Sequence, residues 1–494
     1  MFFQRTHEEE IKRIIREDSF KAGMSDLTII LHEVNRFYSS KERNWMLTGA
    51  NYFKGIHDIL KKRRVAYGKQ GQEIELKRLP NSRVIDNEYR RMVIQKTNYL
   101  SGKPFTVNAD NDAYEDILSE VFTQGFFREF KNVTRDALNY GIAWLYPYYD
   151  EQGEFKFKRF DAYEVIPLWA DKDHTVLEGA IRIYPVDVYD GKQDIVIYHV
   201  EVISPEGIDY YECDFTKLTP IAPYHTDHMT MNNVHYNWAR VPLVPFKYTD
   251  EQPLIMHCKS LQDGINAILS NFEDNMEEDV HKSILILVNY DGQDLGEFKA
   301  NLATYGAVKV RTTDGVAGDL KTLTVEVNSD NYQLILDLFR KSIVQNCMGY
   351  DATEARTLGN PNQMNIQSVY NDIDMDASDM ETEFQASLEH LLYFINVHLY
   401  NTGKGNYLNE KVIFTFNTDM PMDESSKIAN IMASQGLLSK ETLLARHPYV
   451  DDVAGELDRL EKQEKEALSM YDNSFPDRGV NNAEDRYTPA KTTE

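Results

Sequence analysis

The feature that most constrains the fold is an ordered change of hydrophobic period in the second half of the chain. Residues 258–279 repeat apolar side chains every three to four positions, which predicts a helix of about 22 residues and roughly 33 Å. Residues 283–325 then change to short apolar runs with a turn at Asp291-Gly292, a pattern typical of strands. The helical period returns over 330–348. The chain is therefore expected to form a long helix, a small β-rich excursion and a second long helix.

A polar segment and a third long helix follow this pattern. Residues 349–365 are rich in Asn and contain two Gly and one Pro, which predicts a loop. Apolar side chains then recur at helical spacing from Val369 to Ile395, and glycines at 403 and 405 are expected to end this helix. A short strand is expected at 412–416.

The N-terminal half mixes helical and strand patterns, which predicts an α+β domain. Helical periods run over 26–66, 87–100 and 113–140, and strand-like alternation runs over 141–169, 176–189, 194–203 and 208–215. The aromatic-rich stretch 141–169 contains a turn at 150–153 and is expected to form a hairpin.

The two ends of the chain have different compositions. Residues 1–25 carry mixed charges and predict a mobile or docking arm, whereas residues 423–470 predict short helices that include one opened by Ser439. Residues 473–494 are rich in Asn, Asp and Pro with few large apolar side chains, which predicts disorder. The N-terminus lacks the apolar core of a signal peptide, and no apolar run approaches the roughly 18 residues of a membrane span.

Charge is distributed unevenly along the chain, whose formal net charge is −26. Residues 1–100 hold 20 Lys and Arg against 13 Asp and Glu, a net charge of +7, so the remaining 394 residues carry −33. A protein that grips duplex DNA tightly is expected to be basic, because neutralised phosphates drive binding. Two interpretations stay open: DNA is not a partner, or DNA passes without being held. The basic cluster at 61–64 is interpreted as a solvated helix end, with a nucleic-acid contact as the alternative.

Carboxylates are densest between 372 and 383 and raise the possibility of a metal-dependent nuclease or hydrolase. Helical geometry scatters them, and it places Asp372, Asp376 and Asp379 on one face opposite the apolar stripe. A solvated or channel-facing surface is the favoured interpretation, and the acidic cluster at 273–279 is interpreted in the same way. The nuclease stays as the alternative.

Other chemistry-bearing residues form no recognisable catalytic set. His225 and His228 flank Asp227 in a stretch interpreted as a loop, Pro223 to Asn237, where surface histidines are favoured over a metal site. The sequence contains no zinc-protease, phosphate-loop or nucleophile-elbow motif. Three cysteines widely spaced in the sequence argue against a disulfide framework and fit a reducing compartment. The sequence therefore predicts no cofactor, no metal and no enzyme.

Several short motifs recur in the order expected for one known family. They are Asn87–Ile94, Asn98–Pro104, Gly141–Trp144, Val241–Phe246, Leu261–Asn266 with Ser270, Asn271 and Asp274, Leu358–Pro361, Asp372–Met375 and Gly436–Thr442. Together they resemble the portal proteins of tailed bacteriophages, of the type found in long-tailed phages of Gram-positive bacteria, over roughly residues 26–470. After Pro361 that family often has a Ser-Gly pair followed by Ala-Leu-Lys, whereas this chain has the more polar residues 362–367.

The resemblance implies an α+β phage portal fold with wing, helical stem, small β-rich clip, tunnel loop and helical crown. The implied parts are an N-terminal arm (1–25), wing (26–256), first stem helix (257–282), clip (283–327), second stem helix (328–348), tunnel loop (349–365), long helix and strand (366–420), crown (421–472) and disordered tail (473–494).

The resemblance also implies a role and partners. The expected assembly is a virion-located ring of twelve subunits at a capsid vertex, assembled in the host bacterial cytoplasm without a membrane. Double-stranded DNA would pass through it, and the terminase large subunit, a head-completion or adaptor protein, and the major capsid and scaffold proteins would contact it. Another capsid-associated adaptor stays as an alternative.

Two sets of residues are expected to serve these partners. The tunnel set is Arg356, Asn360, Asn362, Gln363, Met364 and Asn365, with Arg356 as a possible phosphate contact, and the clip set is Asp291, Lys299, Lys309, Arg311 and Asp314.

Overall fold

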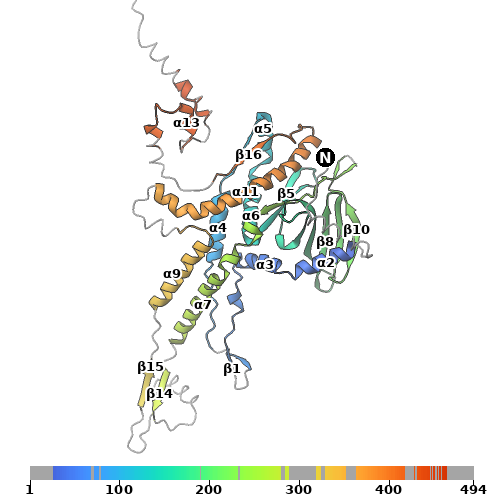
Figure 1. Ribbon diagram of the computed structural model, residues 1–494. Coiled ribbons are helices and arrows are strands. Elements are labelled where there is room, and N and C mark those ends of the chain that lie inside the picture. Colours follow the sequence, from blue (N-terminus) through green and yellow to red (C-terminus); the bar gives the residue numbers. More distant parts are fainter. Residues whose placement is uncertain are drawn as a thin grey trace, which may run out of the picture. The chain divides into compact units, whose positions relative to one another are not determined.

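The computed structural model divides the chain into two compact units (Figure 1). One unit comprises residues 1–357 and 369–420, and the other comprises 358–368 and 421–494. The described residues are 26–67, 72–76, 79–189, 191–231, 234–279, 284–288, 319–323, 329–351, 363–417 and short stretches between 428 and 465.

The N-terminal helices of the first unit begin and end where local capping chemistry predicts. They are α2 (Asp26–Tyr38), α3 (Lys41–Phe53), α4 (Glu88–Ser101), α5 (Asp112–Val121) and α6 (Gln124–Tyr140). Ser40 accepts a hydrogen bond from the Arg43 N–H at the start of α3, and Asn87 accepts one from the Arg90 N–H at the start of α4. These caps satisfy amides that have no partner in a first helical turn. Gly141 ends α6 with a φ of 84°, a conformation that favours glycine.

The two larger sheets of this unit are antiparallel, with strand orders β13-β4-β5 and β10-β9-β8-β7-β6. Their strands are β4 (Ile142–Tyr149), β5 (Phe155–Phe160), β6 (Val165–Trp169), β7 (Leu177–Tyr189), β8 (Asp194–Ser204), β9 (Gly207–Cys213), β10 (Leu218–Thr226) and β13 (Val244–Lys247). The predicted hairpin across 150–153 is confirmed, because β4 pairs with β5 and Trp144 lies opposite Phe160.

Smaller antiparallel pairs complete the β structure in the described residues. They are β1 (Val65–Tyr67) with β2 (Glu73–Glu75), β3 (Thr106–Ala109) with β16 (Val412–Thr415), β11 (Met229–Met231) with β12 (Val234–Tyr236), and β14 (Ile284–Val288) with β15 (Asp319–Leu323). The β3–β16 pair joins the end of the first unit to its N-terminal half.

An aromatic core holds this junction together, with Phe105 at its centre. Its ring centroid lies 5.0 to 6.2 Å from those of Phe122, Phe126, Phe127, Phe130, Phe414 and Phe416. Most of these pairs are edge-to-face, the arrangement that aromatic quadrupoles favour. Since Phe414 belongs to β16, the last strand of the unit contributes to the core formed by α5 and α6.

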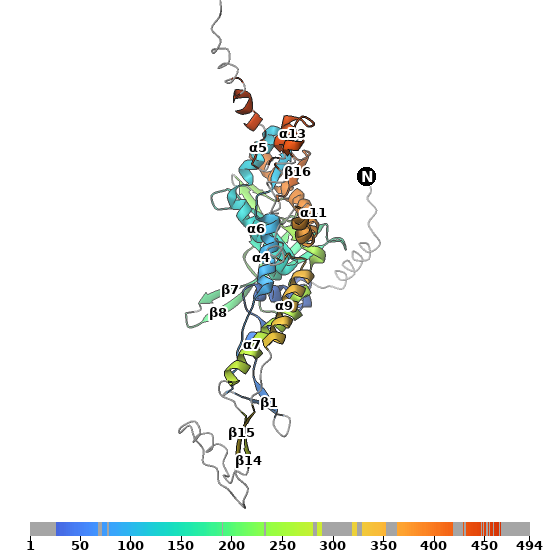
Figure 2. The same ribbon diagram turned by 90° about the vertical axis from the view of Figure 1, so that its left-hand side faces the viewer.

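Two long helices, α7 (Ile255–Asp279) and α9 (Ser329–Asn346), run side by side (Figures 1 and 2). The rings of Phe272 and Tyr332 pack with centroids 5.1 Å apart. A Cβ atom at Gly264 would lie 2.7 Å from the Phe339 ring, so a larger residue there would displace this ring from the space between the two helices. The strands β14 and β15 lie between these helices in the sequence. The predicted order of helix, β excursion and helix is thus confirmed for the described residues.

The long helix α11 (Gln363–Asn401) buries its predicted apolar stripe, including Ile373, Phe384 and Leu388. It begins inside the loop predicted at 349–365, so that prediction is wrong for residues 363–365. Gln and Met are good helix formers despite their flexibility, and polarity alone does not prevent a helix.

In the second unit, Ser439 accepts a hydrogen bond from the Thr442 N–H at the start of α13 (Lys440–Ala445), as predicted. None of the described helices has the combined length and apolarity that crossing a membrane requires.

Candidate functional site: the joints of the long helices

One face of α7 carries a polar ladder, which consists of the buried residues Gln262, Asn266, Ser270 and Asp274. Their side-chain oxygens accept hydrogen bonds from backbone N–H groups of the segment that leads into α4 and of the first turn of that helix. The pairs are Tyr89 to Gln262 (3.0 Å), Asp86 to Asn266 (3.1 Å), Val84 to Ser270 (2.9 Å) and Ser82 to Asp274 (2.6 Å).

The spacing of the two partners explains this match. Four residues of a helix advance about 6 Å, and two residues of extended chain advance about 6.6 Å. Side chains at every fourth helical position therefore meet the N–H groups of residues 82, 84 and 86 in turn. The segment obtains from α7 the hydrogen bonds that a neighbouring strand would otherwise supply, and unpaired buried amides would be costly. Hydrophobic periodicity does not detect such a ladder, whose signal is the four-residue spacing of polar side chains.

An ion pair lies at the end of the polar ladder, where Asp274 contacts Lys62. Lys62 Nζ lies 2.8 Å from the Asp274 carboxylate and 3.0 Å from Asn271 Oδ1. Burial alone would raise the pKa of Asp274, but Lys62 and the Ser82 N–H together hold that pKa below its ordinary value. The interpretation of 61–64 as a solvated helix end is therefore wrong for Lys62, because its partner is distant in the sequence.

A second charged group fixes α7 near its first turns. Lys259 Nζ lies 2.8 Å from Asp58 and 2.6 Å from Asp263, and the Tyr52 hydroxyl donates to Asp263 at 2.5 Å. The hydrogen bond from Lys259, supported by Lys61, lowers the pKa of Asp58 to about 2. These contacts connect α7 to the end of α3 and to the residues that follow it.

A buried ion pair joins α4 to α11. Lys96 Nζ lies 2.6 Å from Asp376 Oδ2, and the two side chains are 2% and 6% exposed. Tyr248 donates a hydrogen bond to the other oxygen of Asp376 at 2.9 Å. Burial lowers the pKa of Lys96, and the Asp376 carboxylate opposes that shift. Tyr99 donates to Asp374 at 2.7 Å, so α11 is fixed at two neighbouring positions.

We call these three groups of contacts the joints: the polar ladder with Lys62, the group around Lys259, and the pair of Lys96 and Asp376. They show that the acidic clusters are not uniformly solvated. Asp376 and Asp274 are buried partners of lysines and do not lie on solvated faces, whereas Asp372 and Asp379 are exposed as predicted. Helical periodicity assigns a carboxylate to a face, but it contains no information about a partner from elsewhere in the chain. Within the described residues, no group of three or more His, Cys, Asp or Glu side chains could hold a metal ion.

The prediction of a loop over 223–237 is also wrong. The stretch contains the end of β10 and the β11–β12 hairpin. His225 Nδ1 lies 2.6 Å from the Asp209 carboxylate on the neighbouring strand, so this nitrogen is engaged in a hydrogen bond within the chain. Burial lowers the pKa of His228 to about 4. Polar residues alternate with Met and Val in this stretch, so its composition resembles that of a loop although the segment forms strands.

Most of the predicted tunnel and clip residues lie outside the described residues. These are Arg356, Asn360, Asn362, Asp291, Lys299, Lys309, Arg311 and Asp314. Gln363, Met364 and Asn365 form the first turn of α11.

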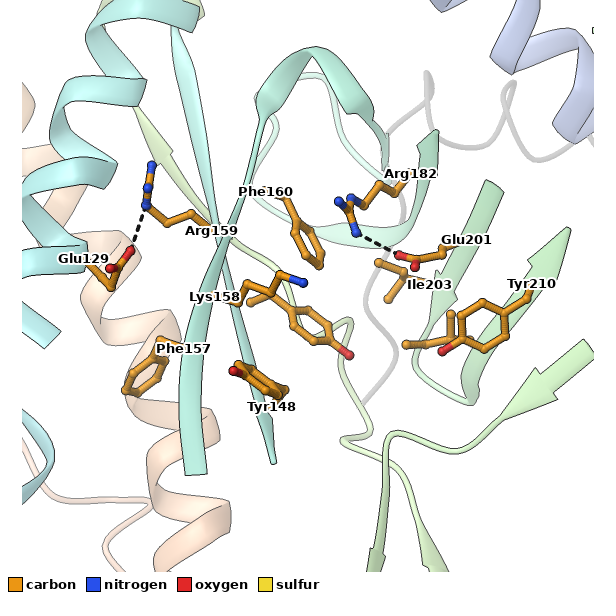
Figure 3. A pocket seen from close by; sticks show the side chains of 12 residues that line it. Glu129, Tyr148, Phe157, Lys158, Arg159, Phe160, Arg182, Glu201, Ile203 and Tyr210 are labelled. Carbon is orange, nitrogen blue, oxygen red and sulfur yellow. Dashed lines mark hydrogen bonds and ion pairs between the residues drawn. The ribbon is translucent and has the colours of Figure 1, made fainter. Parts of the chain in front are cut away.

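A groove of 550 Å³ lies between the two larger sheets (Figure 3). Arg182 stacks 4.1 Å above the Phe160 ring and pairs with Glu201 at 3.3 Å, and Arg159 pairs with Glu129 at 2.9 Å. Each of these two arginines therefore already has a carboxylate partner within the chain. We interpret the groove as part of the packing between sheets.

Comparison with known proteins places the chain among the portal proteins of bacteriophages. It belongs to the family described as "Phage portal protein, SPP1 Gp6-like", whose model matches residues 38–470. The matched range includes the polar ladder and the buried pair of Lys96 and Asp376.

Two relatives illustrate this membership. The portal protein of Bacillus phage SPP1 is 28% identical over 487 residues, which cover 96% of this chain and 94% of the relative. The portal protein of Clostridium phage phiCD119 is 27% identical over 437 residues, which cover 86% and 93%.

Among solved structures, the neck of a native GTA particle computed with C12 symmetry has 13% sequence identity and a TM-score of 0.39. This match covers 72% of this chain and 88% of that chain. A likeness this low carries no argument about the fold.

Family membership decides the broad class of function. Members of this family are structural, non-enzymatic components of phage heads. The resemblance drawn from the scattered motifs is confirmed, and so is the prediction that the chain is not an enzyme.

Proposed function

We propose that twelve copies of this chain form a closed ring whose channel admits double-stranded DNA into the phage head and later releases it. The ring assembles in the host cytoplasm and occupies one vertex of the capsid. Membership of the portal family over residues 38–470 is the observation that carries this proposal.

The long helices suit the stem of such a ring. The pair α7 and α9 forms the stem, the clip (283–327) lies between them in sequence, and residues 26–256 form the wing. The polar ladder supports this division, because it attaches α7 to the wing through directional hydrogen bonds. The tunnel loop precedes α11, and residues 421–472 form the crown.

The net charge of the chain supports a channel through which DNA slides, and not a protein that holds DNA tightly. Duplex DNA carries one phosphate charge per roughly 1.7 Å of its axis, so a basic lining would hold it by counterion release. The net charge of −33 outside the first hundred residues favours sliding. In the tunnel loop, Arg356 contacts a phosphate, while Asn360 and Asn362, together with residues 363–365 at the start of α11, offer uncharged contact.

The clip serves the partners outside the capsid. Its residues Asp291, Lys299, Lys309, Arg311 and Asp314 dock the terminase large subunit during packaging and a head-completion or adaptor protein afterwards. The wing contacts the major capsid and scaffold proteins.

Native mass measurement and negative-stain imaging of the purified chain test the ring directly. Rings with a central channel are expected over a range of salt concentrations. A stable monomer under all of these conditions would contradict the proposal.

Two variants separate the channel from the docking role. Arg356→Ala should impair DNA packaging while rings still assemble, whereas loss of assembly would make that loop part of the subunit interface. Reversal of Lys309 and Arg311 to Glu should weaken terminase binding to preformed rings. Unchanged binding would remove these residues from the docking site.

A further inference from the structure

A groove beside α4 has a charge unlike that of the rest of the chain. It measures 720 Å³ and is lined by Arg90 and Arg91 of α4 and by Lys131 of α6, and Ile94 and Asn98 also line it. No carboxylate lines the described part of this groove, although the whole chain has a formal net charge of −26. We call this feature the basic groove.

Two of the three cations of the basic groove lack the carboxylate partners that Arg159 and Arg182 have in the groove of Figure 3. Within the described stretches, neither Arg90 nor Lys131 makes an ion pair, and Arg90 lies 5.3 Å over the Phe53 ring. Arg91 does pair with Glu88 at 3.1 Å, yet its side chain remains 46% exposed. Three cations that converge on one groove with a single carboxylate beside them favour an anionic partner.

A complementary surface lies on α11. Asp372, Met375 and Asp379 are exposed and lie on one side of that helix, spaced by three and four residues. No ion pair is made by either aspartate within the described residues, and Met375 is 48% exposed. We call these three residues the acidic ridge. The basic groove likewise combines cations with an exposed apolar side chain, because Arg90 and Lys131 line it together with Ile94, which is 41% exposed.

We propose that the acidic ridge of one copy of this chain docks into the basic groove of the next copy. An exposed helix ridge suits a groove, and contact of Met375 with Ile94 would form an apolar centre inside a charged rim. The α11 helix of the same copy is already fixed by Asp376 on its buried side, so its ridge is free for another molecule.

This interface explains how a ring can close. The groove and the ridge are different surfaces of one chain, so each copy uses its groove for one neighbour and its ridge for the other. Such heterologous contacts produce rings when the rotation between copies closes. The inference rests on the proposed ring and adds the surfaces that build it.

Charge reversal on either side provides the test. The groove variant carries Arg90→Glu and Lys131→Glu, and the ridge variant carries Asp372→Lys and Asp379→Lys. Each variant alone should raise the protein concentration needed for half-assembly by roughly 100-fold or more, because every interface then opposes like charges. Native mass measurement reports assembly, and circular dichroism reports whether each variant is folded.

An equimolar mixture of the two variants is the decisive measurement. In a ring where the two variants alternate, two kinds of interface occur. At one, the natural acidic ridge of the groove variant meets the natural basic groove of the ridge variant. At the next, the reversed, basic ridge meets the reversed, acidic groove. Every contact is then complementary, so rings containing equal numbers of both variants should form. As a matched control, Arg36→Glu reverses an exposed cation on α2, with a side chain 68% exposed, and should assemble like the natural chain.

The outcomes separate this inference from the ring itself. Rings that tolerate both reversals, or folded variants whose mixture does not assemble, would overturn the interface and leave the ring intact. A natural chain that never assembles would overturn the ring. Rings of the groove variant that form normally but lose binding to a short DNA duplex would overturn the interface and assign the groove to phosphate contact.

Discussion

Replacing Lys96 with methionine should destabilise the chain by about 3–5 kcal/mol, because the Asp376 carboxylate would remain buried without its cation. The carboxylate side chain is only 6% exposed, so water cannot take the place of the ammonium group. Tyr248 would still donate to Asp376, which favours the lower half of that range. Methionine keeps most of the length of lysine, so the change removes charge with little loss of packing.

A second substitution isolates the charge from the packing. Lys96→Met combined with Asp376→Leu removes both ions and leaves the Tyr248 hydroxyl without its acceptor, at a cost of about 1–3 kcal/mol. The double variant should therefore be more stable than Lys96→Met alone. The matched control is Lys61→Met, which breaks a pair with Asp58 at 3.0 Å whose side chains are 82% and 49% exposed. That loss should stay below about 1 kcal/mol.

Urea unfolding followed by near-ultraviolet circular dichroism would measure these differences at protein concentrations where the chain is monomeric, since assembly would add stability. The reasoning would be refuted if Lys96→Met lost no more stability than Lys61→Met. It would also be refuted if the double variant were less stable than the single one.

Three further perturbations test the joints and the core. Asn266→Leu removes the acceptor of the Asp86 N–H, so the free energy of unfolding in urea should fall by about 1–3 kcal/mol. Hydrogen exchange at the Asp86 amide should also become faster, and an unchanged exchange rate would contradict the polar ladder. Burial lowers the pKa of His390 from 6.5 to about 4. Between these two pH values the unfolded chain therefore binds more protons than the folded chain, and protonation favours unfolding. The Tm should consequently fall as the pH is lowered from 7.5 to 5. His390→Phe should reduce that fall, and an identical fall would exclude His390 as a source. Gly141→Ala should lower the Tm and reduce the free energy of unfolding by more than about 1 kcal/mol. The reason is that φ is 84° and that a Cβ atom would lie 2.1 Å from the Glu251 carbonyl oxygen. An unchanged Tm would show that the turn relaxes.

Local patterns in the sequence predicted most of the secondary structure, because those patterns are caused by short-range physics. The period around Met92 and Leu100 and the break at 101–104 predicted α4 closely. The alternation across 150–153 predicted the β4–β5 hairpin for the same reason. Each of these signals lies within about one turn or one strand of the residues that it describes.

The joints could not be predicted in this way, because their partners lie far apart in the sequence. Asp274 and Asp376 look like other members of acidic clusters until Lys62 and Lys96 are placed beside them. The start of α11 at Gln363 differs from the predicted loop because a polar composition does not distinguish a loop from an exposed helical turn. A charged residue on a helix has a predictable face, but whether that face is solvated depends on tertiary packing.

The choice of polar joints is consistent with a subunit that must hold a fixed angle. An apolar contact between α7 and the segment before α4 would bury similar area, yet apolar surfaces tolerate small shifts because their attraction has no direction. Hydrogen bonds at four successive positions allow only registers that satisfy all four acceptors. In the proposed ring, an angular error in one subunit would be repeated at every interface and would prevent closure. We therefore expect that apolar replacement of the ladder would broaden the distribution of subunit numbers in assembled rings, which native mass measurement would detect, even where each variant remains folded.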